Sequence, residues 1–225
     1  MAWTELATSA VEGGELVLYR AEDGVFMIRA NGLELMNGHD HRSAEVLGQL
    51  AGEHALREAR GREPRVLIGG LGLGYTLAGA AAALAGRGTI AVAEISDGVI
   101  AWYERYFEPS LFAARPSGAR LVRADVGAFI RAAEAASYDA IALDVDNGPE
   151  AMVAAGNEHL YGADGLKALG SALTPGGLGL VWSGFEAPAF AARAEAAGFA
   201  VGCDRVAIPR RPGLYHYIYR LRRRA

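Results

Sequence analysis

Hydrophobic and polar residues alternate near the start of the chain, as they do in strands with one buried face. Residues 15–29 carry this alternation around a turn sequence at residues 22–24. The pair Asn31 and Gly32 then stands between two strand-like runs, which is typical of a tight hairpin. We therefore expect residues 15–37 to form a three-stranded meander, which is too small to be stable without a packing partner.

The pattern changes at residues 43–60, where apolar side chains return at helical spacing behind Ser43, a residue type favoured at helix N-caps. From there on, short apolar runs alternate with helical segments. Strands that alternate with helices predict a mostly parallel sheet with both faces covered. The last two strands are joined by a short loop, so they are expected to pair antiparallel. We expect strands at residues 65–70, 89–94, 120–124, 138–144, 178–183, 201–208 and 215–221, and helices at residues 75–85, 97–106, 126–135, 162–173 and 187–197.

This order of elements is typical of one fold class. Five parallel strands followed by an antiparallel pair resemble the class I methyltransferase-like arrangement, a Rossmann-like α/β fold with a mostly parallel seven-stranded sheet. We expect residues 1–42 to form a small N-terminal β-meander subdomain and residues 43–225 to form the Rossmann-like domain.

Composition narrows the functional classes. Of the 225 residues, 52% are hydrophobic, enough for a continuous core, and the net charge of −4 gives no electrostatic reason to expect nucleic-acid binding. The single cysteine, Cys203, excludes an intramolecular disulfide and a cysteine metal cluster. No apolar stretch approaches the roughly 20 residues of a membrane helix, and the first residues lack the pattern of a signal peptide. We therefore expect a cytoplasmic protein with no membrane partner.

The ends of the predicted parallel strands carry the candidate chemistry. In such sheets ligands bind beyond the carboxyl ends of the strands, where the strand order reverses. A glycine-rich loop at residues 69–74 follows the first strand, and the next three strands end at Glu94, Asp125 and Asp144. The glycines let a ligand approach the backbone and expose amide hydrogens at a helix start. An acid about 20 residues beyond such glycines suits two ribose hydroxyls, and Asp125 is placed to accept from an adenine amino group.

Each of these features alone also has a purely structural interpretation. Glycine-rich turns are common, Glu94 could favour a helix start through the helix dipole, and Asp125 could be an N-cap. Together, in this order, they indicate an adenosyl-binding site. The dinucleotide fingerprint is not met, because its third glycine would fall at Tyr75 or Leu77, and no P-loop lysine follows the glycines. This favours a nucleoside with a sulfonium group over NAD.

The motifs resemble those of the polyamine aminopropyltransferase, or spermidine synthase, family. The resemblance rests on the glycine loop, on the segments around Glu94, Asp125 and Asp144, and on residues 173–177 and 182–188. It implies a transferase that moves an aminopropyl-type group from an S-adenosyl sulfonium donor to a small-molecule amine. The implied co-substrate is decarboxylated S-adenosylmethionine or S-adenosylmethionine, without a metal, and the implied assembly is a homodimer.

The resemblance also implies roles for particular residues. Asp144 would be catalytic, because it would orient the attacking amine or accept its proton. The residues implied to bind the co-substrate are Gly70, Gly72, Gly74, Glu94, Ile95, Asp125 and Val126, and those implied to bind the acceptor are Asp146, Glu45 and Asp40.

Three departures from the family's pattern leave other functions open. Gly72 stands where the family has an acid that binds the aminopropyl amine, residues 43–45 lack the family's tyrosine, and the loop after Asp144 is short. A methyltransferase that uses S-adenosylmethionine on a small molecule would tolerate the missing acid. The third alternative is a non-catalytic protein that keeps the nucleoside pocket.

Overall fold

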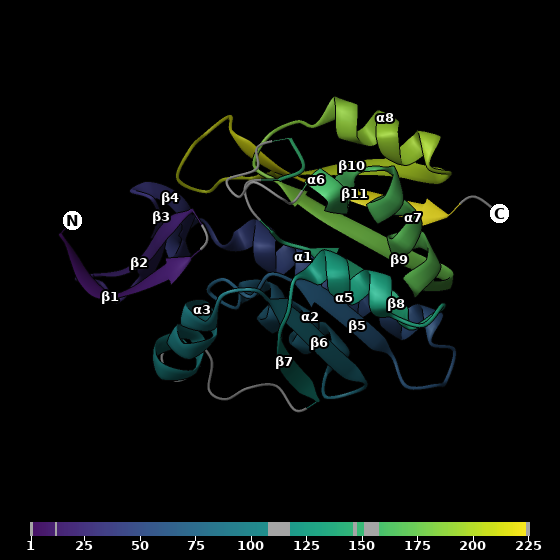
Figure 1. Cartoon of the computed structure of the whole chain (residues 1–225), viewed down its shortest axis with the longest axis horizontal. Helices are drawn as coiled ribbons and strands as arrows, with labels where there is room; N and C mark the ends of the chain where they lie inside the picture. The colour runs from purple at the N-terminus through teal and green to yellow at the C-terminus, as the bar shows by residue number, and fades with distance from the viewer. Residues whose placement is uncertain (1, 12, 108–117, 146–147, 151–157, 224–225) are drawn as a thin grey trace.

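The structure is a computed structural model that describes residues 2–11, 13–107, 118–145, 148–150 and 158–223. Its described strands form two sheets (Figure 1). The smaller one is an antiparallel meander whose strand order follows the chain. Its strands are β1 (Trp3–Val11), β2 (Gly14–Ala21), β3 (Phe26–Ala30) and β4 (Leu33–Asn37).

The meander has one more strand than the sequence pattern predicted. Strand β1 was missed because none of its side chains is fully buried and a register shift between Glu5 and Ala7 interrupts its alternation. The predicted hairpin between β3 and β4 is confirmed. Asn31 and Gly32 have φ values of 49° and 79°, which suits a two-residue turn whose two central residues both need positive φ.

The larger sheet has seven strands, as predicted. Its order is β10-β11-β9-β8-β5-β6-β7, with β5 to β9 parallel to one another and β11 antiparallel to both β9 and β10. The chain runs outward from β5 in one direction and from β8 in the other, so the order reverses between these two strands. The bounds are β5 (Arg65–Gly69), β6 (Thr89–Glu94), β7 (Ala119–Arg123), β8 (Tyr138–Leu143), β9 (Leu173–Ser183), β10 (Phe199–Ala207) and β11 (Tyr215–Arg223).

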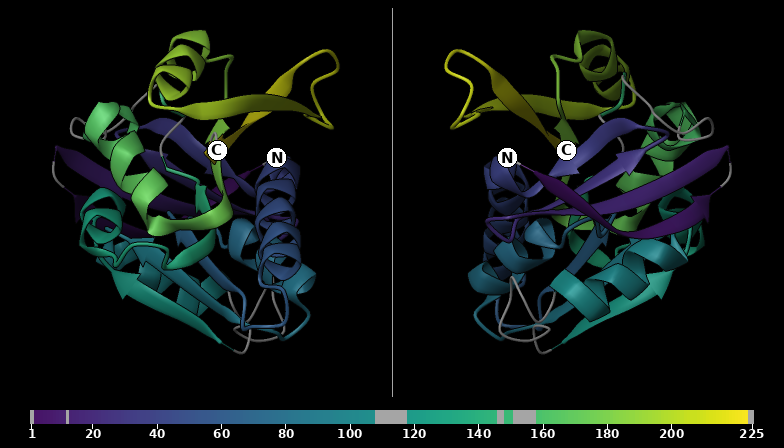
Figure 2. Two further views of the ribbon diagram at one scale, coloured as in Figure 1. Left: turned by 90° about the vertical axis from the view of Figure 1, so that its right-hand side faces the viewer. Right: turned by 90° about the vertical axis from the view of Figure 1, so that its left-hand side faces the viewer.

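Helices cover both faces of this sheet (Figures 1 and 2). One face packs into a cluster with α1 and α2, and the other into a separate cluster with α5, α7 and α8. The helices are α1 (Arg42–Glu58), α2 (Tyr75–Leu84), α3 (Asp97–Trp102), α5 (Val126–Ala132), α6 (Glu158–Tyr161), α7 (Ala163–Ala172) and α8 (Pro188–Ala196), with a 3₁₀ turn η1 (Gly38–Asp40) and a π-helical turn η2 (Tyr103–Phe107).

The predicted N-cap at Ser43 is wrong. The N-cap position lies two residues earlier, at His41, so α1 begins at Arg42, and the His41 side chain makes no capping hydrogen bond. The preceding 3₁₀ turn continues directly into α1, so the chain needs no serine cap there. The hydroxyl of Ser43 instead contacts Trp182 and His216, and the residue lines the large cavity described below.

The meander is stabilised by the main domain. Leu18, Phe26 and Ile28 are buried in the same apolar cluster as Leu71 of the glycine loop and Phe107 of η2. The right-hand view of Figure 2 shows the meander lying across the end of the main domain. This contact provides the packing partner that an isolated meander lacks, and it brings β3 and β4 against the loop after β5.

No helix in the described part of the chain is long and apolar enough to cross a membrane.

Candidate active site

A cavity of about 1980 Å³ opens at the carboxyl ends of the parallel strands. Its floor is formed by the loop after β5 and by the ends of β6, β7 and β8. Its walls come from β3 and β4, from the start of α1, and from β9 with the β10–β11 hairpin. Pockets for one small ligand are commonly about 300–1,000 Å³, so this cavity has room for two substrates side by side.

The glycine loop passes close to other backbone. Gly70 has φ of +86°, and a Cβ atom on it would collide with the carbonyl oxygen of Asp144. Gly74 has φ of 89° and is the N-cap residue of α2. These left-handed conformations favour glycine, and they turn the loop so that α2 begins at the cavity.

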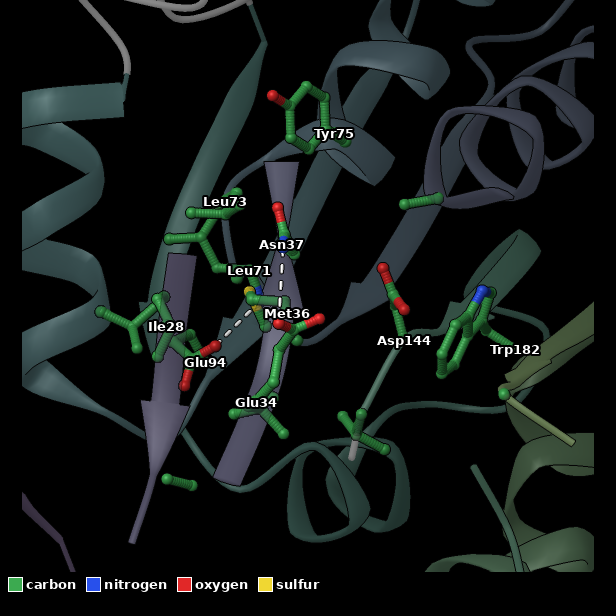
Figure 3. Close-up of a pocket in the computed structure, with 18 of the residues that line it drawn as sticks. Ile28, Glu34, Met36, Asn37, Leu71, Leu73, Tyr75, Glu94, Asp144 and Trp182 are labelled. Atoms are coloured by element: carbon green, nitrogen blue, oxygen red, sulfur yellow. Dashed lines mark hydrogen bonds between the residues drawn. The ribbon is translucent and has the colours of Figure 1, made fainter. Parts of the chain in front are cut away.

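Glu94 holds the glycine loop in place. Its carboxylate accepts hydrogen bonds from the backbone N–H of Leu71 at 2.9 Å and of Ser96 at 2.8 Å. Figure 3 shows Glu94 beside Leu71 on the cavity wall. Burial raises the pKa of Glu94, and these backbone bonds oppose the shift. The carboxylate of Glu94 also lines the cavity, so it lies at the wall that a ligand would contact.

Asp125 caps α5, so its interpretation as an N-cap is confirmed. Its Oδ1 atom accepts from the N–H of Ala128 at 2.6 Å and lies 3.8 Å from Nε2 of His159 and 3.9 Å from Arg131. The side chain also lines the cavity. A cap and a ligand contact are compatible here, because these three contacts all use one of the two carboxylate oxygens.

Asp144 follows β8 directly, at the point where the strand order reverses. The Thr76 hydroxyl at the start of α2 donates to its Oδ2 atom at 2.5 Å. Burial raises the pKa of Asp144 to about 6, although the bond from Thr76 lowers it. In Figure 3 its carboxylate lies in the cavity near the Trp182 ring.

The other predicted site residues divide into three groups. Ile95, Val126, Gly72 and Asp40 line the same cavity. Glu45 does not line it, because its carboxylate lies 3.4 Å from both His41 and Arg42. Asp146 lies outside the described residues.

Asp40 has an unusual environment for a carboxylate. Its Oδ1 atom is buried and has no hydrogen-bond partner within the described part of the chain, and its Oδ2 atom lies 3.7 Å from Arg211. A buried carboxylate oxygen without a donor is costly. A ligand carrying N–H groups would satisfy it.

Several residues of the site were missed by the sequence analysis. Thr76 was read only as part of a helix, and Met36 only as part of a strand. Met36 Sδ and Cε lie 2.7 Å from the position a Gly72 Cβ would take. Trp182 and His216 line the cavity with Ser43. Trp182 begins one of the segments that carry the family resemblance but was given no role in the site, and no local motif marks His216. Such contacts join segments distant in sequence, so periodicity alone cannot reveal them.

The charge of the cavity favours cationic ligands. Among the described lining residues, seven are acidic and two are arginines, so carboxylates predominate even if every histidine is neutral. The acids are Glu34, Asp40, Glu94, Asp97, Asp125, Asp144 and Glu186, and the arginines are Arg123 and Arg211. A cleft lined mostly by charges of one sign raises the local concentration of ligands that carry the opposite charge.

Comparisons with known proteins identify the fold. No protein-family model matches the sequence, and no curated protein matches it. Among solved structures, the chain is similar to spermidine synthase from Thermotoga maritima, with a TM-score of 0.70 and 16% identity over 96% of this chain and 72% of that one. A spermidine synthase in complex with the transition-state analogue AdoDATO gives 0.69 and 16%, with the same coverage. A probable spermidine synthase from Corynebacterium glutamicum gives 0.64 and 15%, over 96% and 78%. The chain therefore has the methyltransferase-like fold of the spermidine synthases, with an N-terminal meander, as its sequence motifs predicted.

Proposed function

We propose that the protein transfers an aminopropyl-type group from an S-adenosyl sulfonium donor to a small-molecule amine. The observation that carries this proposal is the position of Asp144. It is a carboxylate at the switch point of the sheet, and it lines the same cavity as the glycine loop, Glu94 and Asp40. The fold shared with spermidine synthases, one of them bound to a transition-state analogue, supports the same conclusion.

One set of residues binds the nucleoside of the donor, and Asp40 binds the acceptor. Glu94 accepts from the ribose hydroxyls, and Asp125 accepts from the adenine amino group with its second oxygen. Ile95, an exposed apolar residue beside the cavity, and Val126 contact the base. Gly70 and Gly74 keep the loop backbone close to the nucleoside. Asp40 accepts from a distal nitrogen of the acceptor, which satisfies its buried oxygen.

The reaction is an in-line displacement. The nitrogen lone pair of the acceptor forms a bond to the carbon beside the sulfonium, the carbon–sulfur bond breaks, and its electron pair stays on sulfur to give neutral methylthioadenosine. Asp144 aligns the amine and takes up the proton that the nitrogen loses. Sulfonium is already a good leaving group, so alignment supplies most of the rate enhancement.

The pH dependence follows from the raised pKa of Asp144. We expect kcat/KM for the amine to fall on the acid side of about pH 6, as the carboxylate becomes protonated and can no longer accept. Thr76→Val removes the hydrogen bond that lowers this pKa, so the acid limb should move to higher pH. Initial rates of both proteins between pH 5 and 9 test this, and an unmoved limb in T76V would contradict the assignment of the limb to Asp144.

Methyl transfer from S-adenosylmethionine is the second candidate, and Gly72 favours it. The position has no side chain, and Met36 fills the space where one would project. A loop acid that would bind the donor's ammonium group is therefore absent here, and the end of the Met36 side chain occupies the space in which it would project.

Calorimetry with three nucleosides tests both candidates. For the aminopropyl proposal we expect binding of methylthioadenosine and of decarboxylated S-adenosylmethionine, and weaker binding of S-adenosylmethionine, because a donor carboxylate would enter an acidic cavity. Equal or tighter binding of S-adenosylmethionine would favour methyl transfer. Absence of binding by all three would refute the nucleoside site itself. Asp125→Ala provides a site variant that should weaken all three affinities together.

A further inference from the structure

A hydrogen-bonded group of three side chains lies across the cavity from Glu94. The indole Nε1–H of Trp182 donates to the Ser43 hydroxyl at 3.0 Å, and the same oxygen lies 2.7 Å from Nδ1 of His216. The rings of Trp182 and His216 are 4.9 Å apart and tilted by 60°. All three residues line the cavity, although they come from β9, α1 and β11, so the fold brings them together from distant parts of the sequence.

The sheet register places this group beside Asp144. Leu143 of β8 pairs with Val181 of β9, so Asp144 and Trp182 follow at corresponding positions of neighbouring parallel strands. Side chains at corresponding positions point to the same face, and neighbouring strands are about 4.8 Å apart. Both residues contact the helices of one face, because Asp144 bonds Thr76 of α2 and Trp182 bonds Ser43 of α1.

The donors and acceptors of the group fix its protonation state. Indole nitrogen only donates, so the Ser43 oxygen must accept from Trp182. Ser43 is only 3% exposed, and its own proton has Nδ1 of His216 as its acceptor. The neutral His216 then carries its proton on Nε2. Burial lowers the pKa of His216, the nearby Asp40 carboxylate opposes this shift, and Arg211 adds to it, so the ring is neutral at physiological pH.

Trp182, whose indole N–H is hydrogen-bonded to Ser43, lines the cavity with its ring. Its N–H is already used by Ser43, and part of the ring packs on the apolar core. What remains for a ligand is the π surface of a half-buried indole next to a carboxylate. An aromatic face and a carboxylate together attract an ammonium group, and the aromatic contribution is largest for tryptophan.

We propose that Trp182 and Asp144 form the two sides of a subsite for the attacking nitrogen of the acceptor, which binds there as an ammonium group before it loses a proton, and that Ser43 and His216 are positioning residues that hold the indole in place. The subsite rests on the proposed function in that the acceptor is an amine. It adds a specificity-determining residue, Trp182, and two residues that act through it. Neutral acceptors of the same length should bind poorly, because they gain neither contact.

Fluorescence tests the subsite without turnover. Titration with 1,4-diaminobutane should change the tryptophan emission of the native chain saturably, and 1,4-butanediol should not. Trp182→Phe should abolish this response, whereas Trp3→Phe, a substitution outside the cavity, should keep it. A response to the diamine that persists in W182F, or an equal response to the diol, would overturn the proposal.

Variants of the two positioning residues give the second test. Ser43→Ala and His216→Phe should each raise the dissociation constant or KM for the diamine by about tenfold, the order expected when an aromatic contact is misaligned. His216→Asn keeps an acceptor near the Nδ1 position and should stay close to the native value. Affinity for methylthioadenosine should be unchanged in all three. A proportional loss of nucleoside and amine binding would mean that the group is only structural and would overturn the positioning role.

The two proposals fail in different ways. If the native chain transfers the aminopropyl group but Trp182 does not respond to the diamine, the subsite is wrong and the proposed function stands. If Trp182 responds but no nucleoside binds, the subsite stands and the proposed function is wrong.

Discussion

Replacing Asp144 with asparagine is expected to lower kcat for group transfer by about 10²–10⁴-fold, the range typical of a lost general base. Asparagine keeps the size of the side chain and can still accept the bond from Thr76, but it cannot take a proton from the attacking nitrogen. The affinity for methylthioadenosine should change little, because the proposed function assigns nucleoside binding to Glu94 and Asp125 and not to Asp144. Single-turnover rates and calorimetry on the same protein preparations measure both quantities.

Stability provides an internal check on this variant. A carboxyl group whose pKa is raised in the folded state binds its proton more tightly there than in the unfolded chain. The ionised form of Asp144 therefore destabilises the fold above about pH 6, and this penalty decreases as the pH falls below that value. The asparagine variant loses that unfavourable contribution and should be at least as stable as the native chain at pH 7.5. A loss of activity accompanied by a lower Tm would therefore point to misfolding rather than to missing chemistry.

A matched substitution separates local from general effects. Asp204 on β10 is a half-exposed carboxylate with a charged partner, Arg220 at 2.9 Å, and it is not a lining residue of the cavity. Asp204→Asn should leave kcat within about twofold, because an exposed ion pair contributes little. If native protein binds the nucleosides but turns over no amine, there is no rate for D144N to lower, and the non-catalytic alternative is supported.

The placement of the site at one sheet edge was predictable from the sequence because the order of strands and helices determines which residues meet at that edge. Once the parallel strands were recognised, the residues after β5, β6 and β8 had to meet at their carboxyl ends. Gly70, Glu94 and Asp144 therefore line one cavity, as the strand pattern implied. Asp125 shows the limit of this reasoning, because its position allowed an N-cap or a ligand contact and the fold is compatible with both.

The contacts that complete the site could not be read from periodicity. Ser43 was taken for a cap because serine is common there, but its hydroxyl bonds Trp182 and His216, 139 and 173 residues away in sequence. Glu45 belongs to the same helix, and its carboxylate pairs locally instead of lining the cavity. Helical spacing assigns a residue to a face. It does not say which distant side chain meets that face.

Replacing Gly70 with alanine is expected to destabilise the fold by about 2–5 kcal/mol. An alanine with φ near +86° costs about 1–2 kcal/mol, and overpacking against the Asp144 carbonyl adds about 1–3 kcal/mol because backbone atoms cannot move aside easily. The methyl group would also push the glycine loop away from the end of β8. Methylthioadenosine binding should therefore weaken in the fraction that remains folded. Urea denaturation followed by circular dichroism gives the first quantity, and calorimetry gives the second.

Gly86 provides the control, because it shares the backbone strain but not the collision. Its φ is +78°, and a Cβ atom there would have no neighbour within 4 Å. Gly86→Ala should therefore cost only the conformational penalty of about 1–2 kcal/mol and leave nucleoside affinity unchanged. The difference between the two variants isolates the close approach of the glycine loop to Asp144. Equal destabilisation by the two substitutions would mean that this approach is looser than the structure has it, and Asp144 would then not be held against the loop to which we assign nucleoside binding.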